Sequence, residues 1–376
     1  MKKIILVAGA RPNFMKIAPI LRELRRNYSS SIQPVLVHTG QHYDPNMSGS
    51  FFAELGIADP EYNLEVGSAT HAEQSAAIMV GFEKVCAKEQ PNMVLVVGDV
   101  NSTIAAGLVA KKMNVKLAHV EAGLRSGDSA MPEEINRLAT DAIADIFFTT
   151  EKQGTENLLR EGKPPQAVHF VGHVMIDNLF YQLHKQDKTG PNPEIASFKD
   201  RLGEKYACLT LHRPSNVDKR EHLQHIVTAL QDISRELPVI FPCHPRTRSR
   251  LEGFGLLDAM LPSEKLSGSV KKGIVLFVPL GYNDFLYFWK NASVVLTDSG
   301  GLQEETTALG VPCLTLRENT ERPITLECGS NVLVGRDMDL LCQSVSSILA
   351  GRFKSHRVPD LWDGLASERI AKVLSI

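Results

Sequence analysis

The sequence predicts an α/β protein with parallel β-sheets, divided into two halves of similar size. Short apolar, β-branched runs alternate with helical patterns along the whole chain, an order that is typical of parallel sheets. The length of 376 residues fits about two domains of ordinary size. Polar residues gather directly after the apolar runs, where the loops of an open parallel sheet face a crevice.

The expected strands follow one another at short intervals. They are 3–7, 34–39, 93–98, 115–120 and 146–149 in the first half, and 168–171, 207–211, 238–242, 274–277, 293–296, 313–316 and 332–334 in the second. The stretch 164–172 favours a domain boundary, which gives an N-terminal domain 1–170 and a C-terminal domain 171–360. Apolar residues at helical spacing in the tail predict a last helix, 361–376, and such a helix often packs back on the first domain.

Composition and charge exclude several classes of protein. The hydrophobic content of 43% and the charged content of 22% are typical of a soluble globular protein. A formal charge of −2 offers no basic surface for nucleic acid and no polybasic patch for a membrane. The first apolar run ends before Arg11, so it predicts a buried strand and not a signal peptide, and no run is long enough to span a membrane. Six cysteines without CxxC spacing indicate reduced core residues of a cytoplasmic protein.

The stretch 297–322 combines the end of a strand, a glycine turn and the start of a helix. Ser299, Gly300 and Gly301 stand at the turn, and free backbone N–H groups at such a helix start bind anions. Glu305, one turn into the helix, can accept hydrogen bonds from two sugar hydroxyls. The stretch therefore predicts a site for a diphosphate and a ribose, although from spacing alone a plain αβ turn explains it about equally well.

Charged residues also follow three expected strands of the first half. Arg11 and Lys16 come after the first strand, where a pair of cations suits an anion. Asp99 follows the third strand, and His119 and Glu121 stand at the end of the fourth. Two strands of the second half end in the same way, at 212–213 and at 244–246.

A helix that begins at Pro132 adds further charges. Glu133 and Arg137 are four residues apart on this helix and should therefore share one face. The apolar residues at helical spacing are expected to form its buried face: Ile135, Leu138, Ala139, Ala142 and Ile146.

Each of these residues, taken alone, has a structural explanation. Asp99 can cap a helix, and Glu133 near a helix start can interact favourably with the helix dipole. His119 is more typical of a core histidine whose hydrogen bonds are satisfied than of a ligand. The whole set favours function, because three carboxylates, one histidine and several arginines all lie at the carboxyl ends of strands.

With these residues in place, the chain resembles the UDP-N-acetylglucosamine 2-epimerase family, in particular its non-hydrolysing bacterial type. The resemblance covers almost the whole chain. Its specific segments are 98–99 (GD), 121–125 (EAGLR), 132–137 (PEEINR), 298–305 (DSGGLQEE) and 320–323 (TERP). Membership implies two Rossmann-like domains that face each other across a cleft, as in GT-B glycosyltransferases, the second of which binds UDP. It also implies that the last helix returns to the first domain.

The resemblance implies a chemistry as well. The family inverts C2 of the sugar by anti elimination of UDP to 2-acetamidoglucal and syn re-addition, which needs carboxyl groups on both sides of C2. The catalytic residues implied by the family's motifs are Asp99, Glu121, Glu133 and His212. The implied substrate contacts are Arg11, Lys16, Arg137, Phe285, Ser299, Gly300, Gly301, Glu305 and Arg322. No nicotinamide or other cofactor is needed because nothing is oxidised, there is no convincing metal motif, and a homodimer is expected.

The chain departs from the family's common pattern after the expected strand 207–211. Pro214 and Ser215 stand where many members carry Arg and Glu. Such features resemble a subgroup that includes epimerases of UDP-diacetamido-glucuronic acid and some hydrolysing relatives, so both remain as alternatives. A GT-B glycosyltransferase and a non-catalytic nucleotide-sugar-binding protein are further alternatives, against which the three clustered carboxylates argue.

The resemblance also implies a candidate regulatory site. In bacterial relatives a second substrate molecule activates the enzyme there, and the corresponding residues of this chain are Gln41, His42, Arg213 and His244. Asp44 replaces a common glutamine beside them and would repel the phosphates of that ligand. We therefore expect activation by UDP-N-acetylglucosamine to be weak or absent.

Overall fold

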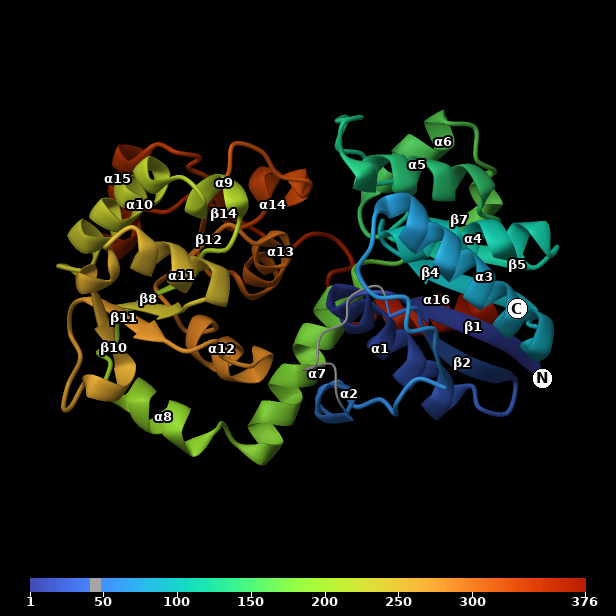
Figure 1. Cartoon of the computed structure of the whole chain (residues 1–376), viewed down its shortest axis with the longest axis horizontal. Coiled ribbons are helices and arrows are strands. Elements are labelled where there is room, and N and C mark those ends of the chain that lie inside the picture. The colour runs from blue at the N-terminus through green and yellow to red at the C-terminus, as the bar shows by residue number, and fades with distance from the viewer. Residues whose placement is uncertain (41–48) are drawn as a thin grey trace. The chain divides into compact units, whose positions relative to one another are not determined.

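The computed structural model describes residues 1–40 and 49–376. By its internal contacts the chain divides into two compact units, one formed by Met1–Tyr181 with Asp360–Ile376 and the other by Gln182–Pro359. Each unit contains one parallel sheet with helices around it (Figure 1). The predicted α/β class with two Rossmann-like units is therefore confirmed. Among the described residues, no helix combines the length and the apolar character that a membrane crossing requires.

The first unit is built on a sheet with the strand order β3-β2-β1-β4-β5-β6-β7, all pairs parallel. Its strands are β1 (Lys2–Ala8), β2 (Ile32–His38), β3 (Tyr62–Asn63), β4 (Met93–Val97), β5 (Lys116–Val120), β6 (Ile146–Thr149) and β7 (Val168–Phe170). Its helices are α1 (Arg11–Asn27), α2 (Gly49–Glu54), α3 (His71–Glu89), α4 (Asn101–Lys112), α5 (Pro132–Ile143), α6 (Lys152–Arg160), the 3-10 turn η1 (Pro165–Ala167) and α16 (Ala366–Ser375). Helix α7 (Val174–Thr189) begins in this unit and continues into the second.

Helix α16 belongs to the first unit although it lies at the other end of the chain. It packs against α1, as Figure 1 shows, and Lys2 Nζ donates to the carbonyl of Leu374 at 3.2 Å. Asp177 on α7 caps α16, because its carboxylate accepts from the backbone N–H groups of Ala366 and Ser367 at 3.1 and 2.6 Å. These contacts join the last helix to the first strand and the first helix.

Helix α5 corrects one prediction. Its buried residues are the polar Glu134, Arg137, Thr140 and Asp141. Of the residues expected on the buried face, Ile135 and Leu138 are 55% and 42% exposed, Ala142 is exposed, and Ala139 and Ile146 are half-buried. The prediction was wrong because the polar face of this helix finds hydrogen-bond partners inside the unit, as described below.

The second unit repeats the same topology. Its sheet has the order β10-β11-β9-β8-β12-β13-β14, all pairs parallel. The strands are β8 (Ala207–Thr210), β9 (Val239–Pro242), β10 (Met260–Pro262), β11 (Ile274–Phe277), β12 (Val294–Thr297), β13 (Cys313–Thr315) and β14 (Asn331–Leu333). The helices are α8 (Pro193–Asp200), α9 (Pro214–Val217), α10 (Arg220–Ile233), α11 (Pro245–Gly253), α12 (Tyr282–Trp289), α13 (Gly300–Leu309), α14 (Pro323–Glu327) and α15 (Met338–Leu349), with 3-10 turns η2 (Leu257–Ala259) and η3 (Ser263–Lys265).

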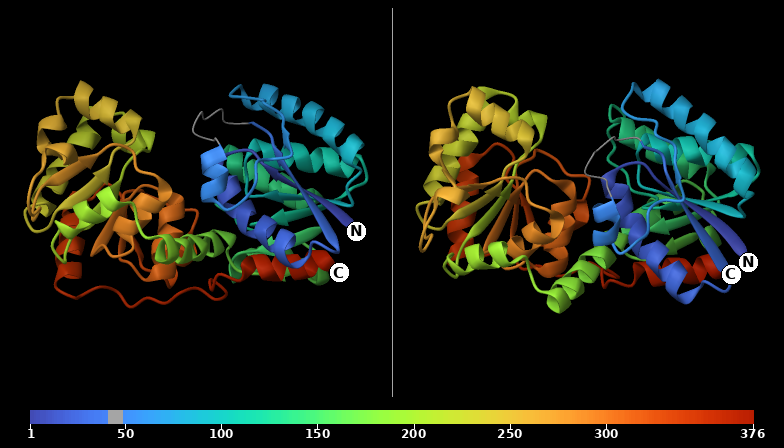
Figure 2. Two further views of the ribbon diagram at one scale, coloured as in Figure 1. Left: turned by 90° about the horizontal axis from the view of Figure 1, so that it is seen from below. Right: turned by 60° about the horizontal axis from the view of Figure 1, so that its bottom comes forward.

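Helices cover both faces of this second sheet (Figure 2). Alternate strand residues such as Leu209 and Leu296 pack against buried side chains of α10 and α15, including Leu230 and Leu341. On the strand β12 all four residues are buried, which is why this part of the sequence is a continuous apolar run. All six cysteines are free thiols, and four of them are buried.

All twelve expected strands are present, within two residues at each end. The expected strand 168–171 is β7, and it pairs with β6 in the first sheet. Two strands were not expected, β3 and β10, because they span two and three residues and one ends in a proline.

Candidate functional site

Several predicted site residues follow the strands at the topological switch point of each sheet, among them Arg11 and Asp99 in the first unit and His212 and Ser299 in the second. In the first unit the chain leaves β1 for β2 on one side, while β4 lies on the other side of β1. In the second unit β8 takes the place of β1 and β12 that of β4. At such a point the loops that follow two adjacent strands run to opposite sides. They leave a crevice at the carboxyl ends of the strands, where ligands of α/β proteins bind.

Lys16 and Glu121 form a buried ion pair in the first unit. The Lys16 ammonium lies on α1, 9% exposed, and contacts Oε2 of Glu121, which is 2% exposed. Glu121 directly follows β5 and has a φ of +67°, a left-handed conformation that costs about 1–3 kcal/mol for a residue with a Cβ. Such a conformation at a charged, buried residue is typical of a functional site and not of a packing residue.

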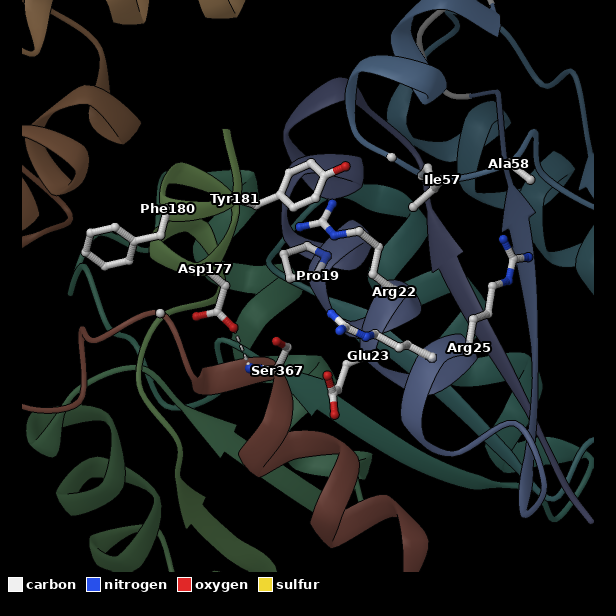
Figure 3. Close-up of a pocket in the computed structure, with 13 residues that line it drawn as sticks. Pro19, Arg22, Glu23, Arg25, Ile57, Ala58, Asp177, Phe180, Tyr181 and Ser367 are labelled. Carbon is white, nitrogen blue, oxygen red and sulfur yellow. Dashed lines mark hydrogen bonds between the residues drawn. The ribbon is translucent and has the colours of Figure 1, made fainter. Parts of the chain in front are cut away.

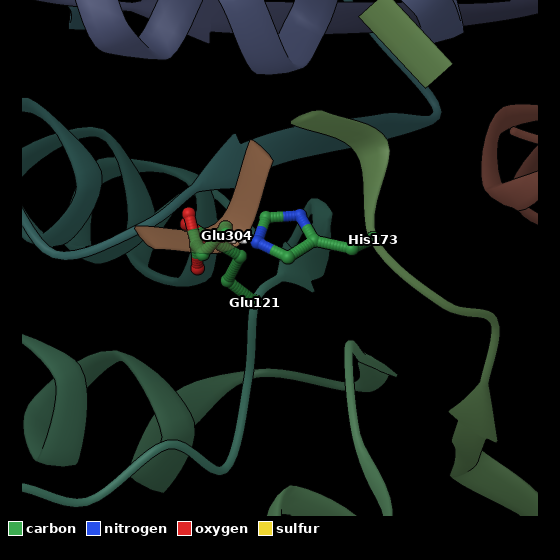
Figure 4. A group of neighbouring side chains, drawn as sticks. All are labelled: Glu121, His173 and Glu304. Carbon is green, nitrogen blue, oxygen red and sulfur yellow. Dashed lines mark ion pairs between the residues drawn. The ribbon is translucent and has the colours of Figure 1, made fainter. Parts of the chain in front are cut away.

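His173 lies beside Glu121 but was not predicted. Its Nδ1 accepts from the backbone N–H of Met175 at 3.2 Å, so its Nε2 carries the proton. That Nε2 is 3.8 Å from Oε1 of Glu121 (Figure 4). The ring packs edge-on against Trp362 with 5.2 Å between centroids. Because His173 stands in a loop before α7, no strand end or helix face in the sequence pointed to it.

Asp99, Arg137 and Glu134 form a second charged group. The guanidinium of Arg137, 3% exposed, pairs with Oδ2 of Asp99 through Nη2 and with Oε2 of Glu134 through Nη1, the latter at 2.5 Å. Asp99 directly follows the turn after β4, and its carbonyl accepts from Asn136 Nδ2 at 2.9 Å. Arg137 therefore fixes the Asp99 carboxylate from the buried side of α5.

Glu134 is the partner of Arg137 on α5, whereas the spacing in the sequence predicted that Glu133 would share a face with Arg137. Burial acts to raise the pKa of Glu134, but hydrogen bonds from the N–H groups of Ser126 and Gly127 and the charge of Arg137 hold it below its ordinary value. Glu133, one residue earlier, has an exposed side chain at the first turn of α5. The residue of α5 that pairs with Arg137 is therefore the one three positions before it, Glu134, and not the one four positions before it, Glu133.

Arg11 occupies the first position of α1 and is exposed. Its guanidinium carbon lies 5.1 Å from the centroid of the Phe51 ring. The helix start and this cation together favour an anion.

In the second unit, Asp298 organises the turn that contains His212. Asp298 is fully buried and accepts from His212 Nδ1 at 3.0 Å and from the backbone N–H groups of His212 and Arg213. Burial acts to raise the pKa of Asp298, but these donors hold it below its ordinary value. The His212 imidazole is thereby oriented with Nε2 as its remaining polar atom.

Glu305 is buried on α13 and receives a hydrogen bond from the hydroxyl of Tyr282 at 2.6 Å. Burial raises the pKa of Glu305 to about 8, which the Tyr282 contact partly offsets. Phe285 lies three residues after Tyr282 on α12 and so shares its helix face. Tyr282 was not predicted, because a tyrosine inside an aromatic helix looks like a core residue.

The glycine turn begins α13 as predicted. Ser299 is its N-cap residue and makes no side-chain capping bond, and Gly300 and Gly301 form the first turn of the helix. Arg322 forms an ion pair with Glu304 on the same helix, one residue before Glu305. A cavity of about 260 Å³ lies at the same edge of this sheet, lined by Arg213, Ser215, Asn216, Leu316, Arg317, Glu318, Asn319 and Arg336.

The candidate regulatory residues are only partly described. Gln41 and His42, with Asp44, lie outside the described residues. Arg213 lines the cavity of the second unit, and the rings of His244 and His212 are 6.2 Å apart between centroids. The regulatory role of these residues stays a prediction.

A larger cavity of about 590 Å³ lies in the first unit among α1, α7 and α16 (Figure 3). The guanidinium of Arg22 lies 3.7 Å from the ring centroid of Tyr181, and Arg25 pairs with Glu61 at 2.6 Å. None of its thirteen lining residues is a predicted site residue.

The fold and these residues define a class of protein: two α/β units with charged side chains after the strands of parallel sheets, as in nucleotide-binding proteins. The family model described as UDP-N-acetylglucosamine 2-epimerase matches residues 22–375. The chain belongs to this family of isomerases.

Individual relatives agree with this assignment. The UDP-N-acetylglucosamine 2-epimerase of Methanocaldococcus jannaschii is 40% identical over 99% of both chains. The UDP-2,3-diacetamido-2,3-dideoxy-D-glucuronate 2-epimerase of Pseudomonas aeruginosa is 38% identical, also over 99% of both. The crystal structure of the M. jannaschii enzyme in complex with UDP-GlcNAc and UDP superposes with a TM-score of 0.83 at 41% identity, covering 100% of this chain and 99% of that one.

Proposed function

We propose that this protein is a non-hydrolysing UDP-N-acetylglucosamine 2-epimerase, which interconverts UDP-N-acetylglucosamine and UDP-N-acetylmannosamine. The observation that supports it most is the pair of carboxylates after neighbouring strands, Asp99 and Glu121, each held by a cation on a helix. A protein that only binds a nucleotide sugar has no use for two such carboxylates at one strand edge.

In the proposed reaction, a carboxylate removes the C2 proton, the C1–O bond breaks, and UDP leaves with the bonding electrons. The product of this step is 2-acetamidoglucal, which UDP attacks again after a proton returns to the other face of C2. Asp99, Glu121 and Glu133 are our candidates for these proton transfers, which typically contribute about 10² to 10⁴ in rate. Arg137 and Lys16 form ion pairs with the first two and hold them in place.

The second unit is proposed to hold UDP. The first turn of α13 and Arg322 would bind the diphosphate, and Arg11 and Lys16 are further candidates for contacts to the substrate. Glu305 would hold the ribose hydroxyls, and Phe285 would stack near uracil. His212, which Asp298 orients through Nδ1, would lie near the phosphates.

The reaction run in D2O tests this proposal. Incubation with UDP-N-acetylglucosamine alone, followed by proton NMR, should give the manno epimer with deuterium at C2 of both epimers. Free N-acetylmannosamine with UDP would identify the hydrolysing variant. Epimers without any C2 label would exclude elimination and re-addition through an exchangeable base.

A second candidate substrate is a UDP-diacetamido-glucuronic acid. The P. aeruginosa relative that acts on UDP-2,3-diacetamido-2,3-dideoxy-D-glucuronate covers the chain as completely as the M. jannaschii enzyme does. Comparing kcat/KM for both UDP sugars under the same conditions decides between them, because discrimination is a ratio of these constants.

The affinity for UDP should depend on pH through Glu305. Its pKa of about 8 means that the carboxyl group is mostly protonated at pH 7. Since ribose hydroxyls donate to a carboxylate, UDP binding releases this proton, and the affinity should rise about tenfold from pH 7 to pH 9. Calorimetric titration of UDP at several pH values measures this. The Glu305→Gln variant should show a flat profile, and a similar slope in both proteins would contradict the assignment.

We also propose that the protein is a homodimer that uses the exposed apolar side of α5. Ile135, Leu138 and Ala142 lie at i, i+3 and i+7 on that side and therefore form a stripe. The double variant Ile135→Glu with Leu138→Glu should be monomeric by light scattering, because two charges in an apolar interface cannot be desolvated cheaply. Leu340→Glu, an exposed leucine of α15, is the matched control and should leave the mass unchanged.

The two compact units are proposed to be the two domains of the protein, the first with the catalytic carboxylates and the second with the UDP site.

A further inference from the structure

His119 and Asp141 link the turns that carry Asp99 and Glu121, although neither takes part in the proposed proton transfers. His119 lies on β5 and Asp141 on α5, and their side chains are 0% and 1% exposed. His119 Nδ1 is 2.7 Å from Oδ1 of Asp141, and its Nε2 is 2.8 Å from the carbonyl oxygen of Gly98. Both distances are those of hydrogen bonds.

The partners determine where the protons lie. A backbone carbonyl can only accept, so the Nε2 of His119 must carry a proton. The other oxygen of Asp141 accepts from the backbone N–H of Gly123 at 3.0 Å and from Nη1 of Arg125 at 2.7 Å. These two donors stabilise the ionised form of Asp141, which also can only accept. The Nδ1 of His119 must therefore carry a proton as well.

We propose that His119 carries a proton on each ring nitrogen, and that with Asp141 it positions the two turns that present Asp99 and Glu121. It acts as a positioning residue and exchanges no proton during turnover, because it is completely buried and both of its N–H groups are occupied.

Both turns need such support because their backbones are unusual. Gly98, directly before Asp99, has a φ of +69°, and its carbonyl is the one that His119 holds. Glu121 has a φ of +67° and Gly123 one of +80°, and a Cβ at Gly123 would lie 2.1 Å from the carbonyl oxygen of Gly154. One ion pair thus fixes the turn after β4 through Gly98 and the turn after β5 through Gly123.

The charges around His119 balance within the unit. Glu161, the C-cap residue of α6, pairs with Arg125 at 2.7 Å, Arg125 pairs with Asp141, and Asp141 pairs with His119, so that negative and positive groups alternate. Because these two negative and two positive groups pair with one another, no charge among them is left for a ligand to neutralise. Burying His119 in its cationic form is acceptable because the charge is both paired and fully hydrogen-bonded.

Neutron crystallography of deuterated wild-type protein at pD 7.5 tests the protonation directly. Deuterons are expected on both ring nitrogens of His119 and on neither oxygen of Asp141. A single deuteron on the ring, or one on Asp141, would overturn the proposal. This measurement does not depend on activity, so it stands even if the protein does not epimerise UDP-N-acetylglucosamine.

The positioning role rests on the proposed function and is tested with Asp141→Asn. Turnover should fall by about a hundredfold, the effect of a misplacement of about 1 Å, while the Kd for UDP stays within about threefold. Asp145→Asn is the matched control, because Asp145 holds the amino end of β5 through Leu117 N–H at 2.7 Å. It should keep turnover within about threefold. If Asp141→Asn and Asp145→Asn both folded and lost turnover equally, the role of Asp141 would be merely structural and the positioning role would be refuted.

Discussion

Replacing Asp99 by asparagine should lower turnover by about 10² to 10⁴ at saturating substrate. Asparagine keeps the shape of the side chain but cannot accept the C2 proton. Arg137, the partner of Asp99, remains paired with Glu134, so the buried cation is not left alone. The proposed UDP site lies among residues of the second unit, and the Kd for UDP should therefore change by no more than about threefold. Initial rates measured by NMR give the turnover, and calorimetric titration with UDP gives the Kd.

The control for this variant is Asp59→Asn, which makes the same chemical change at an exposed position of the first unit. This control should leave the turnover and the Kd for UDP unchanged. An Asp99→Asn enzyme that loses UDP affinity and keeps its turnover would show that the roles of the two units are reversed. The same measurement on Glu133→Gln and Glu134→Gln separates a proton-transfer group from the carboxylate that holds Arg137.

Removing Glu305 should have the second largest effect, on binding and not on chemistry. At pH 9 its carboxylate can accept two hydrogen bonds from the ribose, and bonds to a charged group are worth about 1.5 to 3 kcal/mol each. Glu305→Ala should therefore raise the Kd for UDP by at least about a hundredfold, which corresponds to about 3 kcal/mol. Turnover at saturation should stay close to that of the wild type.

Glu327→Ala, an exposed glutamate on α14, is the control for truncation of a carboxylate in the same unit. Glu305→Gln adds a finer test, because the amide oxygen can still accept from Tyr282 but carries no charge. If Glu305→Ala lowered turnover and left the Kd unchanged, the ribose assignment would be wrong.

The sequence predicted the strands well because parallel strands buried on both faces are continuous apolar runs. Met93–Val97 and Ile274–Phe277 are fully buried along their length. Such runs identify a strand without any knowledge of its neighbours. The strand β3 spans only Tyr62–Asn63, which is too short for any pattern to develop.

Helix α5 shows where such reasoning fails. Periodicity finds the two faces of a helix, but it cannot tell which face is buried when the polar one has partners inside the protein. Arg137 and Asp141 are buried because Asp99 and His119 lie opposite them, and these partners are distant in sequence. Site residues that depend on a tertiary partner, such as His173 beside Glu121, were missed for the same reason.

The docking of helix α16 has a consequence for how the protein is made. The first unit contains Met1–Tyr181 but also Asp360–Ile376, and Asp177 caps the returning helix. A ribosome that adds about 5 to 20 residues per second needs roughly 10 to 40 s to proceed from the end of the first segment to the last helix. During that interval the second unit can emerge and fold while α1 still lacks its neighbour. Synthesis of this chain therefore inverts the usual order, since the unit that begins first is the last to be completed.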